Sequence, residues 1–107
     1  MPLTRDFRAT VMARASRDPE FRVGLLREAV DAFLTGDVDA GKIVLRDYVN
    51  ATVGFEALGQ GVQRNPKSLM RMLGPDGNPR ADNLFAVLSY LESVEGISLH
   101  VSAKRTG

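Results

Sequence analysis

Apolar residues recur every three or four positions through most of this chain, which is the spacing that lines one face of an α-helix. Leu3, Phe7 and Val11 lie four residues apart and predict a first helix from about Thr4, which can cap it, to Arg17. A length of 107 residues suits one domain with a core of its own. The pattern therefore predicts a single, mostly helical domain over residues 1–107.

Acidic residues at two turns predict where the next two helices begin. Asp18 can accept hydrogen bonds from free backbone amides, and Pro19 suits the first position of a helix. Gly36 is a stop signal, and Asp37 can cap a following helix that ends within 50–54. The apolar stripes of these two helices comprise Phe21, Leu25, Ala29 and Phe33 beside Leu26, Val30 and Leu34, and then Val38, Gly41, Leu45, Tyr48 and Val49.

Shorter elements are predicted in the second half of the chain. Turn-forming residues fill 74–79, so this segment is expected to be a loop. After Gly96 the apolar residues Ile97, Leu99 and Val101 alternate with polar ones, which predicts a short C-terminal β-strand. The fold expected is a compact bundle of about five or six helices with that strand: N-terminal helices over about 4–53, a helix pair over about 55–74 with a break at 63–65, and a helix and strand over about 82–103.

The predicted strand bears on assembly. A lone strand leaves its backbone N–H and C=O groups without partners, and no second convincing strand is predicted in the chain. The partner is most simply the same strand of another copy, which predicts a homodimer. An extended tail laid on the domain's own helices is the alternative.

The residues present exclude or disfavour several kinds of site. There is no cysteine, which excludes disulfides and thiolate metal sites, and the one histidine, His100, has no second ligand of its kind. Glu92 and Glu95 fit a solvated helix face better than a general acid and base. No apolar run approaches the roughly 20 residues of a membrane span, and a secretory h-region is missing. We expect a cytoplasmic protein without enzymatic activity, cofactor, metal or membrane contact.

The distribution of charge is more informative than the net charge of +1. Residues 1–50 carry eight basic and eight acidic side chains, whereas the basic residues within 64–80 outnumber the acidic ones by four to one. A local positive excess is what binding to nucleic-acid phosphates uses. These residues are Arg64, Lys67, Arg71 and Arg80 against Asp76.

The helix pair around 63–65 has the composition of a helix-turn-helix, whose second helix lies in the major groove of DNA. Gly59 is small enough for a close crossing of the two helices, and Asn65 can cap the second one. Their expected inner face comprises Leu58, Val62, Leu69, Met72 and Leu73. The candidate DNA-binding residues are Arg64, Asn65, Lys67, Ser68, Arg71, Asn78 and Arg80, which offer donors to phosphates and base edges.

Four segments of this half carry a resemblance: Ala57-Leu58-Gly59, Lys67-Ser68-Leu69-Met70-Arg71-Met72-Leu73-Gly74, Gly77-Asn78-Pro79 and Asn83-Leu84-Phe85. Together with the stretch 36–52 they resemble the HigA-like addiction-module antidote family of Cro/repressor-type helix-turn-helix proteins. The resemblance implies a dimeric antitoxin that represses its own operon, and a RelE/HigB-like ribonuclease toxin encoded nearby as its partner. By matched position it implies that Lys67, Ser68 and Arg71 face the DNA.

The turn departs from that family. Gly59 stands where these proteins usually have alanine, and Gln63 and Arg64 stand where they often have glycine and an aliphatic residue. We expect Gln63 to adopt a left-handed backbone, at a cost of about 1 kcal/mol. Arg64 is expected to point outward, because it cannot fill an apolar site cheaply.

A second class of function stays open from the sequence. In it the same helices form a protein-interaction or dimerisation module without operator binding, and Arg64, Lys67 and Arg71 meet an acidic protein. Salt dependence separates the two, because binding to duplex DNA weakens steeply with salt through counterion release.

Overall fold

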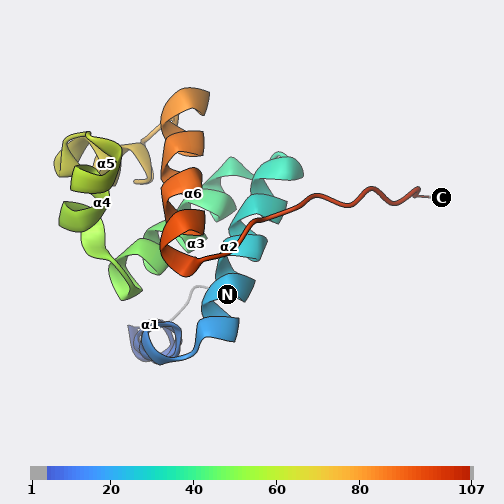
Figure 1. The fold of residues 1–107 in the computed structure, drawn as a ribbon, viewed down its shortest axis with the longest axis horizontal. Helices are drawn as coiled ribbons and strands as arrows, with labels where there is room; N and C mark the ends of the chain where they lie inside the picture. Colours follow the sequence, from blue (N-terminus) through green and yellow to red (C-terminus); the bar gives the residue numbers. More distant parts are fainter. Residues whose placement is uncertain (1–4, 107) are drawn as a thin grey trace.

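Six helices make up most of the described residues, 5–106, of this computed structural model (Figure 1). They agree with the predicted helical segments, although the expected cap Thr4 lies outside the described residues. None of the described helices is both long and apolar enough to cross a membrane. In chain order the helices are α1 (Arg5–Arg17), α2 (Pro19–Leu34), α3 (Val38–Ala51), α4 (Gly54–Val62), α5 (Pro66–Met72) and α6 (Ala81–Glu95).

Side-chain caps begin α2 and α3, as predicted. Asp18 Oδ1 accepts the backbone N–H of Phe21 at 3.2 Å, and Asp37 Oδ1 accepts that of Ala40 at 3.1 Å. The hydrogen bond from Phe21 is the main reason that the pKa of Asp18 lies below its ordinary value. Between the two helices Gly36 adopts a φ of 86°, which lets the chain reverse within three residues.

The core draws on α2 to α6, and α2 and α3 make the most extensive contact of any two helices. A Cβ at Gly41 would lie 2.5 Å from the ring of Phe33, so the glycine is needed for the ring to pack on the α3 backbone. Leu34 and Val38 were expected in the apolar stripes but are exposed, because both lie beside the turn where the helix pair ends. The buried hydrophobic residues contributed by α2 to α6 are Leu26, Ala29, Leu45, Tyr48, Val49, Phe55, Leu58, Leu69, Val87, Leu88 and Leu91.

A buried carboxylate joins α6 to α2 and α3. Glu95 Oε1 accepts from Arg22 Nε at 2.6 Å and from the Tyr48 hydroxyl at 2.5 Å, and its side chain is only 7% exposed. This corrects the expectation of a solvated helix face. Glu95 lies one turn after Leu91 on the same side of α6, so it continues the inward face and needs buried partners.

The predicted C-terminal strand is wrong, since the described residues 97–106 form no strand. Glu92 receives the backbone donors instead: its carbonyl accepts from Ile97 N at 3.0 Å and its carboxylate from Leu99 N at 2.6 Å. Ile97 and Leu99 pack partly against the core, which is the alternative of a tail laid on the domain's own helices. Residues 100–106 are exposed and extend away from the bundle, with Val101 at 73% exposure (Figure 1). The homodimer stays a prediction.

The buried hydroxyl of Tyr48 makes stability depend on pH. Burial raises its pKa above the ordinary value of 10.0, and the hydrogen bond to Glu95 adds to the effect. Because the pKa is raised in the folded state, the contribution to stability is full below about pH 10 and is lost as the pH rises further. We expect the difference in free energy of unfolding between the wild type and Tyr48→Phe to be constant up to about pH 9 and to shrink above about pH 10 in urea titrations. Parallel curves for the two proteins through this range would contradict the expectation.

Candidate nucleic-acid interface

α4 and α5 are two short helices joined by the three residues 63–65, in agreement with the sequence. A Cβ at Gly59 would lie 2.7 Å from the carbonyl oxygen of Arg64 and 2.9 Å from the ring of Pro66. The prediction that Gly59 permits a close crossing is therefore confirmed. Leu58 and Leu69 fill the space between the two helices and are buried, so the relative orientation of the pair is fixed by packing.

The turn depends on one unusual backbone conformation. Gln63 has φ 57° and ψ 50°, and it is the one non-glycine residue with positive φ within residues 5–106. The left-handed conformation ends α4, and it lets the Arg64 N–H return to the carbonyl of Gly59 at 2.9 Å. The prediction for Gln63 is confirmed, and the turn carries the strain of a side chain where glycine would fit freely.

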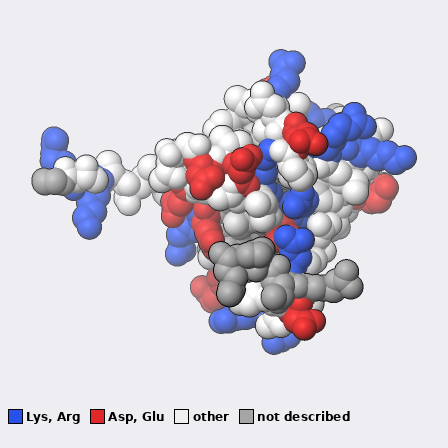
Figure 2. Space-filling view, turned by 180° about the vertical axis from the view of Figure 1, so that it is seen from behind, with Lys and Arg blue, Asp and Glu red and all other residues white. Residues whose placement is uncertain are grey.

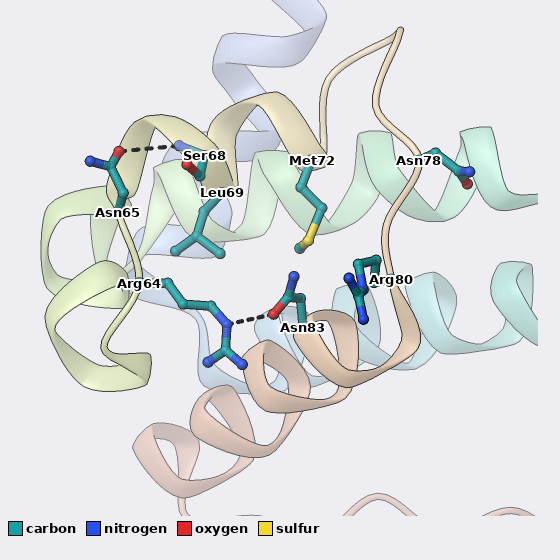
Figure 3. A pocket seen from close by; sticks show the side chains of 8 residues that line it. All are labelled: Arg64, Asn65, Ser68, Leu69, Met72, Asn78, Arg80 and Asn83. Atoms are coloured by element: carbon teal, nitrogen blue, oxygen red, sulfur yellow. Dashed lines mark hydrogen bonds between the residues drawn. The ribbon is translucent and has the colours of Figure 1, made fainter.

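Asn65 caps α5, as predicted. Its Oδ1 accepts the backbone N–H of Lys67 at 2.8 Å. It also accepts that of Ser68 at 3.3 Å (Figure 3). The cap occupies the amide oxygen, so the side-chain nitrogen is the group that Asn65 can offer to a ligand.

Arg64 does not point outward, which corrects the expectation from the sequence. Its Nε donates to Asn83 Oδ1 at 2.5 Å and its Nη1 to the carbonyl of Val62 at 2.8 Å, so the half-buried guanidinium ties the turn to the first turn of α6 (Figure 3). The side chain turns inward because α6 brings an amide acceptor to it. A guanidinium has five N–H donors, so part of its capacity stays open.

An open depression of about 370 Å³ lies between α5, the loop 73–80 and the start of α6. Leu69 and Met72 point from α5 toward α6 and give it an apolar floor (Figure 3). Arg80 is exposed at its edge and makes a solvated ion pair of 3.6 Å with Asp82, which is weak enough to exchange for another anion. Five of the seven candidate DNA-binding residues line this depression: Arg64, Asn65, Ser68, Asn78 and Arg80.

Lys67 and Arg71, the other two candidates, lie outside the depression. Both are exposed and stand one turn apart on the outer face of α5, opposite the buried Leu69. The structure gives neither side chain an ion pair or a hydrogen bond with the described residues. Figure 2 shows Lys and Arg atoms gathered at the upper right, on the side of the molecule where α5 lies. The outer face therefore offers uncommitted positive charge.

Sequence reasoning missed Lys42, a residue of α3 that holds the loop beside the depression. The residue is 3% exposed, and its Nζ donates to the carbonyl oxygens of Gly74 at 3.0 Å and Gly77 at 2.7 Å. A signal was present, because Lys42 lies four residues after Val38 and three before Leu45, on the apolar stripe of the helix. A Cβ at Gly77 would collide with the carbonyls at the end of α5, so the loop lies directly on that helix end.

In the part of the chain that the structure describes, no three acidic or histidine side chains are placed to share a metal ion. His100 is exposed on the extended tail. The chemistry of the site is that of hydrogen-bond donors and fixed positive charge, which suits an anion.

The strain at Gln63 gives a prediction. We expect Gln63→Gly to raise the free energy of unfolding by about 1 kcal/mol, because glycine adopts the left-handed conformation without steric cost. Gln60→Gly is the matched control, since Gln60 is exposed within α4 and glycine there should lower stability by about 1 kcal/mol. Urea denaturation measures both. A destabilised Gln63→Gly would show that the side chain, and not the backbone, matters at this position.

Comparison with protein-family models, with curated protein sequences and with solved structures found no match to this chain. The resemblance to the HigA-like family therefore rests on the quoted segments alone, and the role of the site has to be argued from its geometry and charge.

Proposed function

We propose that the protein binds duplex DNA, with α4 and α5 acting as a helix-turn-helix and the outer face of α5 in the major groove. The observation that carries the proposal is that Arg64, Asn65, Ser68, Asn78 and Arg80 line one depression, directly beside a helix whose outer cations have no partner among residues 5–106. These residues come from a turn, a helix and a loop, and all of them offer donors.

In this proposal the outer face of α5 and the depression beside it contact different parts of the duplex. If the outer face of α5 lies in the groove, the depression beside it meets the sugar-phosphate backbone. Donors from Arg80 and Asn78 then hold a phosphate and fix the register of the protein on the duplex. Lys67 and Arg71 point into the groove, where an arginine can bind guanine through two hydrogen bonds.

The narrower proposal is an antitoxin-like repressor of its own toxin-antitoxin operon, acting as a homodimer with a RelE/HigB-like toxin as partner. Its support is the family resemblance of the segments within 57–85 and 36–52. A short basic, toxin-like reading frame beside the gene would support it. A gene standing alone would leave a solitary DNA-binding regulator.

A protein-interaction module is the second candidate, and one observation favours it. Met70 is 50% exposed on α5, next to the cationic face, and a flexible apolar side chain there suits a protein surface as well as DNA. In this case an acidic protein would cover Lys67 and Arg71. Failure of the wild type to bind any duplex at low salt would decide for this candidate.

The outer face of α5 can be tested with single substitutions. We expect Lys67→Ala and Arg71→Ala to weaken binding to a duplex from upstream of the gene by about 1–3 kcal/mol where a base contact is lost. Stability should change by less than about 0.5 kcal/mol, because both side chains are exposed. The measurements are fluorescence anisotropy at several salt concentrations and urea denaturation.

Arg27→Ala is the matched control, because Arg27 is an exposed arginine of α2 outside the site. It should leave binding nearly unchanged. A duplex of unrelated sequence separates base contacts from phosphate contacts, since losing a phosphate contact lowers the salt slope by about one for every sequence. Wild-type affinity in both α5 variants would exclude this face as the DNA-binding surface.

A further inference from the structure

The ammonium group of Lys42 donates hydrogen bonds to the loop 73–80. Besides Gly74 and Gly77, its Nζ approaches the carbonyl oxygen of Pro75 at 3.4 Å. An ammonium has three N–H donors, so three carbonyls of the loop account for all of them. Among the described residues, its one ion pair is with Asp39, at 3.4 Å, and that side chain is 85% exposed. The main partners of the buried Lys42 ammonium are therefore the loop carbonyls, and not the carboxylate of Asp39.

The loop holds its shape poorly by itself. Pro75 and Pro79 have no N–H to donate, and the described hydrogen bonds join only one pair of backbone groups within the loop, Gly77 N to Gly74 O at 3.0 Å. Without Lys42, the partly buried carbonyl of Gly77 would lose its donor. Together with the packing of Gly77 on the end of α5, the α3 lysine thus holds the loop in one conformation.

We infer that Lys42 is a positioning residue for DNA binding: it fixes the loop so that Asn78 and Arg80 line the depression, without touching DNA itself. Its shortest contact, 2.7 Å, is to Gly77, the residue directly before Asn78. The other end of this short span is fixed where α6 begins, at Ala81. Asn78 and Arg80 therefore lie in a short segment that Lys42 holds at one end and the start of α6 holds at the other. That Lys42 holds the loop rests on the hydrogen bonds described above. That this matters for DNA binding rests on the proposed function.

The first arm of the test measures the loop without DNA. In Lys42→Met, which keeps the apolar stem and removes the ammonium, the Gly77 amide should exchange its hydrogen about tenfold faster or more. Amides in the middle of α6, such as that of Leu91, should keep their protection. Asp39→Ala is the control, because it removes the exposed ion pair and leaves the carbonyl contacts in place.

The second arm is a double-mutant cycle on binding to the upstream duplex. Arg80→Ala should weaken binding roughly tenfold in the wild type, as expected for one lost charged contact. In the Lys42→Met background the same substitution should weaken binding by less than about twofold, because Arg80 is no longer held in place. If Lys42 only stabilises the fold, the losses of DNA affinity caused by Lys42→Met and by Arg80→Ala should be independent. The double variant would then show the product of the two fold-changes.

Each arm of the test can overturn the inference about Lys42. Unchanged exchange at Gly77, or effects of Lys42→Met and Arg80→Ala that multiply, would overturn the inference. If the wild type binds no duplex, the proposed function fails and Lys42 positions nothing for DNA, while the exchange arm still decides whether it holds the loop. If Lys42→Met does not fold, Lys42→Gln takes its place in both arms, since its amide keeps the chain length and loses the charge.

Discussion

The carboxylate of Glu95 is the interaction on which the rest of the arrangement depends. Arg22 from α2 and Tyr48 from α3 both donate to it, so the C-terminal end of α6 is joined to both helices. Removing one partner of such a buried set costs about 3–5 kcal/mol, although the complete set adds little over an apolar equivalent. Its value lies in specifying where α6 lies. Near the other end of α6, Asn83 accepts a hydrogen bond from Arg64 of the turn. The position of α6 therefore also determines where Arg64 lies in the site.

Two basic residues near the site are used to build it. Arg64 joins the turn to α6 and Lys42 joins α3 to the loop, so both are committed to structure before any ligand arrives. Lys67 and Arg71 keep their charge free. A count of basic residues along the sequence does not separate these two kinds, because the difference lies in which acceptors the fold brings near them.

Local signals in the sequence predicted the helices, the caps at Asp18, Asp37 and Asn65, and the conformation of Gln63, because each depends on neighbours a few residues away. The charged residues Glu95 and Lys42 were missed because their partners lie 73 and 35 residues away in the chain. The C-terminal strand failed for a related reason: Glu92 accepts the donors of Ile97 and Leu99, which alternation alone cannot show. The residues of the candidate site were named from the sequence, but their meeting around one depression required α6 to be placed.

The separation of buried and exposed positions on α5 has an evolutionary consequence. Gly59 admits no side chain, and Leu69 is enclosed, so the crossing of the two helices tolerates little change. Lys67 and Arg71 touch nothing that the crossing needs, and exposed substitutions are mostly neutral for stability. Under the proposed function, new DNA-sequence preferences can therefore be selected at these positions one substitution at a time, without loss of the fold at any step.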